Sequence, residues 1–187
     1  MRAFLRSLTV TIILGLALCA LMSPCPAYAA SKAAIDSDVD TALRQLFNST
    51  PAARVLAQEA KAILVFPSVL KAGFIVGAQG GNGALRKKGK TVGYYNTTSA
   101  SYGLQAGIQK YGYALFFMSD SALRYMDKSD GWEIGVGPSI VIVDTGVART
   151  LTTTTVKKEI YAFIFSQKGL MAGLGLQGTK ITRIYPD

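Results

Sequence analysis

Residues 84–91, ALRKKGKT, follow the spacing of a phosphate-binding loop, [AG]-x4-G-K-[ST]. Such a loop uses small residues whose backbone amides surround a phosphate, between a strand and a helix. Here the variable positions are bulky and cationic, and the following residues 91–95, TVGYY, are typical of a strand. The context that nucleotide hydrolysis requires is missing, so the pattern does not predict a nucleotide site.

A second catalytic pattern, S-x-x-K, is formed by Ser68-Val69-Leu70-Lys71, and Ser129-Asp130-Gly131 follows it. This order is reminiscent of penicillin-recognising serine enzymes, which also need the serine at a helix start and a later Lys-Thr-Gly strand. Lys90-Thr91 is followed by valine and precedes Ser129, and the chain is short for that fold. A hydrolase using Ser68 and Lys71 is therefore the third of three hypotheses.

The absence of certain residue types limits the chemistry further. The chain has no histidine, and its two cysteines, Cys19 and Cys25, lie near the N-terminus. Ser-His-Asp and Cys-His catalysis and the usual zinc sites are thereby excluded from the remainder of the chain. We expect a protein that is not an enzyme, with no catalytic residues, no metal and no cofactor.

Four cations, Arg86, Lys87, Lys88 and Lys90, gather at a predicted hairpin tip. Each cation near an acidic membrane contributes about 1 kcal/mol, so four of them could contribute a few kcal/mol. Such clusters are also common in solvated turns that bind nothing. The residues alone leave both interpretations open.

The N-terminus predicts a secretion signal over residues 1–29. Arg2 and Arg6 precede an apolar segment, residues 8–22, and Ala27-Tyr28-Ala29 forms a cleavage site. Neither cysteine follows the small residue that lipid attachment prefers. We therefore expect a Sec-type signal and a periplasmic or secreted protein, peripheral to a membrane if it binds one.

Cleavage after Ala29 would leave 158 of the 187 residues, enough for one domain with a core. The signal holds two of the 20 basic residues and none of the 11 acidic ones, so the mature chain would carry a net charge of +7. A positive domain is attracted to phosphate and acidic lipid head groups, although it also gains solubility. No nucleic-acid partner is expected, because no reader motif is present.

The periodicity predicts one α+β domain over residues 30–187. Apolar spacing indicates N-terminal helices at about 33–61, with Thr50-Pro51 opening the second, and the first is expected to pack on the domain. Short strands follow over about 62–185: one stops at Pro67, a turn lies at residues 80–83, and strands are expected at 132–136 and 150–155. Ser119 is expected to cap a short helix at 120–127. The sheet should be mainly antiparallel and curved or half-barrel-like.

Residues 160–178, IYAFIFSQKGLMAGLGLQG, predict two β-rich segments flanking Gln167-Lys168-Gly169. In the second segment glycines recur on one strand face, which indicates that something approaches the backbone closely. Another sheet element and a lipid acyl chain are both compatible with this pattern.

The same segment resembles the C-terminal signature of the SYLF family, Y-x4-S-x-K-G-L-x-A-G-x-x-L-x-G. The matching residues are Tyr161, Ser166, Lys168-Gly169-Leu170, Ala172-Gly173, Leu176 and Gly178. Further family-like motifs precede it, and the resemblance spans about Ala52 to Ile184. These motifs are residues 60–67 (AKAILVFP), 71–74 (KAGF), 80–83 (GGNG) and 135–138 (GVGP).

The resemblance implies one α+β domain that binds acidic phospholipids. It favours Arg86, Lys87, Lys88 and Lys90 as lipid contacts and adds Lys71 and Lys168 as secondary candidates. Yeast relatives regulate actin, but an exported protein should meet none, so no actin partner is expected. The leading hypothesis is non-enzymatic binding to an anionic phospholipid membrane, and the alternative is an envelope protein-interaction or scaffold module without specific lipid binding.

Overall fold

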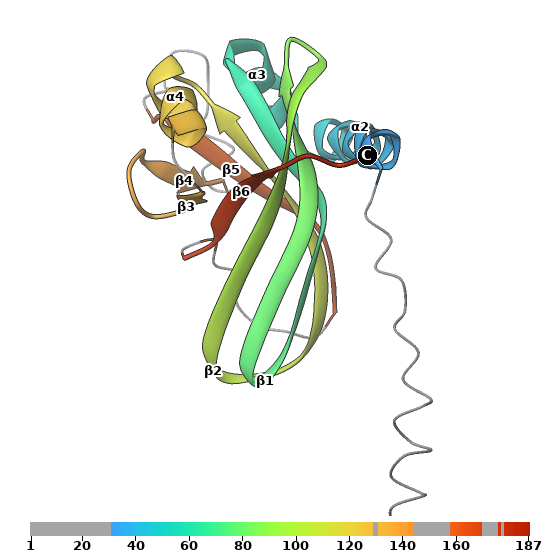
Figure 1. Cartoon of the computed structure of the whole chain (residues 1–187). Coiled ribbons are helices and arrows are strands. Elements are labelled where there is room, and N and C mark those ends of the chain that lie inside the picture. Colours follow the sequence, from blue (N-terminus) through green and yellow to red (C-terminus); the bar gives the residue numbers. More distant parts are fainter. Residues whose placement is uncertain (1–30, 129–130, 144–157, 170–175, 177) are drawn as a thin grey trace, which may run out of the picture.

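The computed structural model describes residues 31–128, 131–143, 158–169, 176 and 178–187 (Figure 1). Within these ranges, two helices precede a long two-stranded hairpin, and a third helix and four short strands follow it. The elements are α2 (Lys32–Ser49), α3 (Pro51–Glu59), β1 (Ala62–Lys87), β2 (Lys90–Phe117), α4 (Asp120–Lys128), β3 (Trp132–Glu133), β4 (Ile140–Ile142), β5 (Ile160–Gly169) and β6 (Lys180–Ile184).

The hairpin of β1 and β2 dominates the fold. The two strands pair antiparallel from Ala62 opposite Phe117 to Lys87 opposite Lys90. Lys88 and Gly89 connect them with φ values of 50° and 78°, and positive φ at both central residues is the geometry of a type I′ turn. This turn chemistry, rather than the glycine run upstream, reverses the chain.

The predicted turn at residues 80–83 is wrong, because these residues lie inside β1 and pair with residues 95–98 of β2. Their glycines permit a close approach instead. A Cβ atom at Gly81 would overlap the carbonyl oxygen of Ser68, and one at Gly83 would overlap that of Val65. The later half of β1 therefore crosses directly over its first half, so the hairpin is folded over on itself.

Pro67 does not end a strand as predicted. β1 continues through it with a shift of register between Phe66 and Val69. A bulge is one of the few positions where a sheet tolerates proline, because no ladder donor is required there. The predicted strand at 132–136 is also shorter than expected, since β3 ends at Glu133.

The remaining strands extend both halves of the hairpin. The first part of β2 pairs with β6, and its last part pairs with β5. β3 joins β6 antiparallel, whereas β4 runs parallel to β5. Six strands thus form one curled, half-barrel-like sheet in a single α+β domain, which confirms the predicted fold class.

The core has two parts. One lies inside the curled sheet and includes Phe66, Tyr113 and Trp132, and the other lies beneath the N-terminal helices. Helix α2 buries its apolar stripe, from Ile35 to Leu46, in this second part, as the sequence predicts.

The starts of two helices also agree with the sequence, although Thr50 makes no side-chain capping hydrogen bond to α3. Helix α3 begins at Pro51. The Ser119 hydroxyl accepts a hydrogen bond from the Ala122 N–H at 3.2 Å in the first turn of α4.

Within the described ranges, no helix has the length and apolar character that crossing a membrane requires. Three predictions fall on residues outside these ranges: the secretion signal at 1–29, the strand at 150–155 and the glycine-lined face of the segment after Gly169. Strand β5 continues through Gln167 and Lys168 to Gly169, which pairs with Gln109.

Candidate functional site

The structure separates the six candidate cations into two groups. Arg86, Lys87, Lys88 and Lys90 lie at the hairpin turn, called here the turn (residues 86–91). Lys71 belongs to the opposite end, where both strands curve back, called here the bend (residues 70–77 and 102–108), and Lys168 lies close to it at the end of β5. Figure 1 shows the turn at the top of the molecule and the bend at the bottom.

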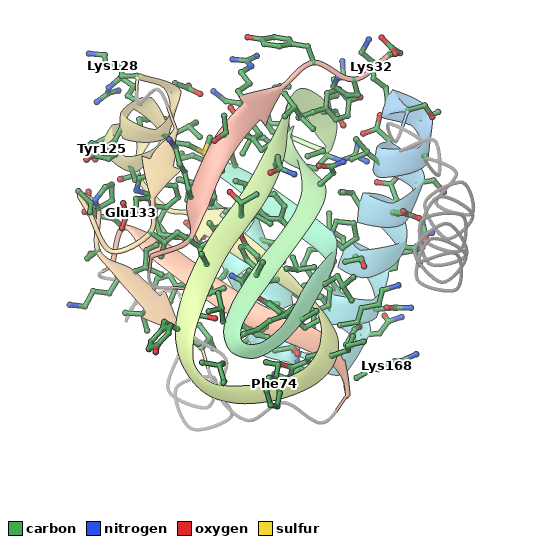
Figure 2. All side chains as sticks on the ribbon, turned by 60° about the horizontal axis from the view of Figure 1, so that its bottom comes forward. Lys32, Phe74, Tyr125, Lys128, Glu133 and Lys168 are labelled. Atoms are coloured by element: carbon green, nitrogen blue, oxygen red, sulfur yellow. The ribbon has the colours of Figure 1, made fainter. Side chains whose placement is uncertain are left out.

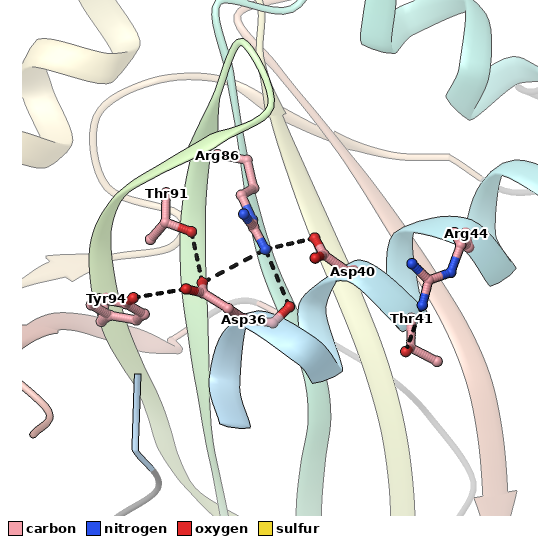
Figure 3. Close-up of polar contacts among 7 residues, drawn as sticks. All are labelled: Asp36, Asp40, Thr41, Arg44, Arg86, Thr91 and Tyr94. Atoms are coloured by element: carbon pink, nitrogen blue, oxygen red, sulfur yellow. Dashed lines mark hydrogen bonds and ion pairs between the residues drawn. The ribbon is translucent and has the colours of Figure 1, made fainter. Parts of the chain in front are cut away.

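At the turn, Arg86 differs from its three neighbours because its side chain is only 12% exposed. Its Nη2 atom donates to Asp40 Oδ1 at 2.6 Å and to the Asp36 carbonyl oxygen at 3.1 Å, both on α2 (Figure 3). The guanidinium therefore fastens the turn to the first helix and does not project into solvent with the lysines.

Asp36 is the centre of this contact. One carboxylate oxygen accepts from the Thr91 hydroxyl at 2.7 Å, and the other accepts from the Tyr94 hydroxyl at 3.0 Å (Figure 3). Burial, and then the hydrogen bond to Asp36, raise the pKa of Tyr94 above its ordinary value. The sequence showed Asp36 only as an acid near a helix start. Its partners are 50 to 58 residues away along the chain, and no local pattern reveals such a pairing.

Lys87, Lys88 and Lys90 are exposed, and Lys87 and Lys88 border a groove of about 620 Å³ between the turn and the first two helices. The apolar part of the groove is formed by Leu43, Phe47, Ala57 and Ile63. Asp40 and Glu59 also line it, so the positive charge of the turn is partly balanced by acids on the helices.

Beside the bend, the structure adds a cation that the sequence analysis missed. Lys110 of β2 pairs with Leu70 on one side and with Lys168 on the other. Lys110 and Lys168 therefore lie opposite each other on neighbouring strands, whose backbones are about 5 Å apart. Both side chains are exposed. The sequence predicted strands over this part of the chain, but strand register was needed to place Lys110 beside Lys168.

The interior of the curled sheet holds paired hydroxyl and amide groups. Tyr111 donates to Gln79 Oε1 at 2.8 Å, and Gln79 Nε2 donates to Thr179 at 3.2 Å. The Thr97 and Tyr113 hydroxyls lie 2.6 Å apart. Burial raises the pKa of Tyr111 to about 12, against the lowering effect of its bond to Gln79. These side chains join the two halves of the hairpin.

Nothing in the described ranges assembles a catalytic constellation from the sequence patterns. Ser68 lies at the bulge of β1 and not at the start of a helix, as a penicillin-recognising serine would. The residues that resemble a phosphate loop form the end of β1, the turn and the start of β2, with no helix after them. Within the same ranges, no three acidic, cysteine or histidine side chains come close enough to share a metal ion.

The fold and its surfaces define a small α+β domain, built on one folded-over hairpin with cations at both ends. Residues 98–184 match the family model described as Ysc84, Las17-binding protein actin regulator. This match is consistent with a SYLF domain, the family that the sequence motifs resemble. A search of curated proteins finds no match.

The family match supports a lipid-binding or actin-regulating domain in general terms, and the family is not known for enzymes. The matched range begins within β2 and ends at the last residue of β6. It includes Lys110 and Lys168, whereas Lys71 and the four cations of the turn precede it.

Proposed function

We propose that this protein is exported and binds acidic phospholipid head groups at a membrane surface, without catalysing a reaction. The observation that supports this proposal most strongly is the distribution of charge along the hairpin. No Asp or Glu occurs between Glu59 and Asp120, so both strands and their turn are free of acid. The same segment contains Lys71, Lys110 and the four cations of the turn.

The ion pairs of the described residues support this separation of charge. Only Arg86 among the cations forms salt bridges there, and both of its partners are on α2. The exposed lysines at either end are left to attract anions from solution. A lysine close to an anionic leaflet contributes about 1 kcal/mol, and the attraction decays within a Debye length.

Cosedimentation with vesicles tests the proposal. The purified protein, expressed as the full chain, should bind vesicles that contain phosphatidylglycerol and leave vesicles of phosphatidylcholine alone in solution. Two charge-reversal variants divide the effect between the ends: Lys87→Glu with Lys88→Glu and Lys90→Glu at the turn, and Lys71→Glu with Lys168→Glu near the bend. Circular dichroism of each variant verifies that it is folded.

At least one of these variants should lose most of its binding to the anionic vesicles. Equal binding to both vesicle types, unchanged in both variants, would show that head-group charge is not recognised. The export part of the proposal is tested by intact mass, which should show a product that begins after Ala29. A full-length product in the cytoplasm would contradict it.

A second function, binding to a protein partner, is favoured by the description of the family as Las17-binding. Its signature would be one stoichiometric partner recovered from envelope extracts in detergent, where lipid contacts are lost. Recovery of that partner by a protein that ignores anionic vesicles would replace the lipid proposal with this one.

A further inference from the structure

We propose that the bend is the part of the molecule that enters the membrane, with its apolar side chains among the acyl chains and its lysines at the head groups. This inference rests on the proposed function and specifies the surface that performs it. The cluster of four cations lies at the turn. The inference assigns the bilayer contact to the opposite end of the hairpin.

The shape of the bend comes from glycine and backbone geometry. Gly73 pairs with Gly107, and a Cβ atom at Gly73 would overlap the backbone of Gly77. Ile75 has a φ of 68°, in the left-handed region that isoleucine rarely adopts. The chain thus makes a tight reversal of direction along both strands, and Phe74 lies at its apex (Figure 2).

Those side chains are large, apolar and exposed. Phe74 is 76% exposed, Tyr102 84% and Ile108 66%, and Figure 2 shows Phe74 at the extremity of the molecule. Six of the eleven large hydrophobic residues that are exposed in the described ranges belong to the bend. They are Leu70, Phe74, Ile75, Val76, Tyr102 and Ile108. A concentrated apolar surface of this kind marks an interaction site, because single exposed hydrophobics are normally scattered.

The charges around the bend identify a bilayer as the occupant. Lys71, Lys110 and Lys168 border the apolar apex, and residues 60–119 and 160–186 contain no acid. Asp38 of α2 is the acid that shares a surface pocket with Lys110. An apolar apex with lysines behind it matches the layering of an anionic leaflet, where acyl chains lie beneath charged head groups. Tyr102 adds the amphipathic ring that is enriched at this boundary.

A second copy of the chain is a poorer match for the same surface. Two bends that met face to face would bring like-charged lysines together, with Asp38 as the acid beside only one of them, Lys110. A bilayer accepts both the apolar and the cationic parts without such repulsion.

The orientation that follows leaves the turn in water. A strand rises about 3.3 Å per residue, so the segment from Ile75 to Lys88 spans about 40 Å when extended. Even half of that distance exceeds twice the Debye length, which is about 8 Å at physiological salt. Lys87, Lys88 and Lys90 therefore contribute little to the bilayer that the bend contacts.

Tryptophan quenching by lipids with brominated acyl chains locates the contact. The natural tryptophan, Trp132, is only 2% exposed in the core and supplies a constant background. Phe74→Trp places a second tryptophan at the bend, and Val92→Trp places one beside the turn, where the natural valine is 47% exposed. With anionic vesicles, Phe74→Trp should be quenched and shifted to shorter wavelength, and Val92→Trp should behave like the wild type.

A matched pair of binding variants gives the second readout. Tyr102 and Tyr185 are both 84% exposed, and Phe74 and Val92 are exposed at opposite ends. Phe74→Ser with Tyr102→Ser should weaken binding to phosphatidylglycerol vesicles by about tenfold or more. Each aromatic side chain that moves from water into the bilayer contributes favourably to the free energy of binding. Val92→Ser with Tyr185→Ser should leave the affinity within about twofold of wild type. Since all four side chains are exposed, the variants should fold normally.

The outcomes separate this inference from the proposed function. Quenching at position 92 and not at 74, or equal binding by the two double variants, would overturn the inference while acidic-lipid binding stands. If the bend variant instead converted a dimer to a monomer without a change in vesicle binding, the bend would be an interface between copies. A wild type that binds no vesicle would end the proposed function, and this inference with it.

Discussion

The turn and the bend are the two ends of one hairpin, yet they differ in almost every property. The turn is polar, and Arg86 fastens it to α2 through Asp36 and Asp40 (Figure 3). The bend makes no such ion pair within the described residues, and it presents Phe74 and its apolar neighbours to solvent. The turn is thus held by contacts within the domain, whereas the apolar side chains of the bend are exposed to solvent.

This difference shows that a count of cations is a poor guide to a binding surface. The turn carries the densest basic cluster of the hairpin, but one of its four charges is neutralised and acids border the adjacent groove. The bend carries fewer cations, but they surround an apolar surface formed by strand segments without acid, and Asp38 of α2 is the acid beside Lys110. Apolar exposure and charge together define the better membrane contact.

The largest effect should come from changing the crossing that folds the hairpin over. Gly83→Ala would drive a methyl group into the backbone of Val65, at a cost of about 3 kcal/mol in the free energy of unfolding. Gly80→Ala, on the same strand, is the control, since its Cβ would lie 3.7 Å from the nearest atom. Urea denaturation measures both. Equal losses would show that the two halves of β1 do not cross as described.

Alkaline pH should loosen the contact between the two halves of the hairpin. Burial raises the pKa of Tyr111 to about 12, above the value of about 10 for an unfolded tyrosine. The stabilisation is complete below pH 10 and is lost as pH rises toward 12, because the unfolded chain ionises first. Tyr111 should thereby lower the free energy of unfolding by about 2 kcal/mol between pH 10 and pH 12.

Denaturation at several pH values checks this slope. Tyr111→Phe should make the alkaline fall in stability shallower, and Tyr102→Phe, at the exposed bend, should leave it unchanged. The slope is compared, and not the absolute stability, because Tyr111→Phe also leaves Gln79 without a donor. An identical slope in wild type and Tyr111→Phe would contradict the assigned burial.

Removal of the guanidinium should release the turn from α2. Arg86→Ala is expected to cost about 1 to 2 kcal/mol of stability, less than a fully buried pair, because Asp36 and Asp40 are partly exposed. Lys87→Ala, the adjacent exposed cation, should change stability by less than about 0.5 kcal/mol. Thermal denaturation compares the two. If Lys87→Ala were as harmful as Arg86→Ala, the distinction between the two residues would fail.

The smallest effect on stability should accompany neutralisation of the turn lysines. Replacement of Lys87, Lys88 and Lys90 by glutamine should shift the free energy of unfolding by less than about 0.5 kcal/mol, since all three are exposed. If the bend alone contacts the bilayer, their replacement should also lower vesicle affinity by less than about threefold. If the variant lost most of its binding, the turn and not the bend would be the main bilayer contact.

The sequence predicted the fold class and the helices because these depend on local patterns. The apolar spacing of α2, Pro51 at the start of α3 and the Ser119 cap of α4 are all short-range signals. The folding-over of the hairpin was not predictable, because Gly81 and Gly83 appear as turn residues until their non-local neighbours, Ser68 and Val65, are known. The sequence analysis recognised that these glycines have a structural role, but it predicted a turn where the structure has a close crossing of two strand segments.

The candidate site divides in the same way. Residue type identified the cations, but the ion pair of Arg86 with α2 and the pairing of Lys110 with Lys168 depend on contacts across 46 and 58 residues of chain. The apolar bend gave no sequence signal, because Phe74, Tyr102 and Ile108 look like ordinary strand residues. Only the three-dimensional structure shows that nothing in the described residues covers them.

The most direct test of the central claim, recognition of a negatively charged bilayer, is a salt titration of vesicle cosedimentation. Between about 0.1 M and about 1 M sodium chloride the Debye length falls from about 10 Å to about 3 Å. Binding to phosphatidylglycerol vesicles should drop steeply over this range, leaving a small remainder that Phe74→Ser with Tyr102→Ser removes. Binding that is unchanged at 1 M salt, or equally strong to phosphatidylcholine, would contradict the claim.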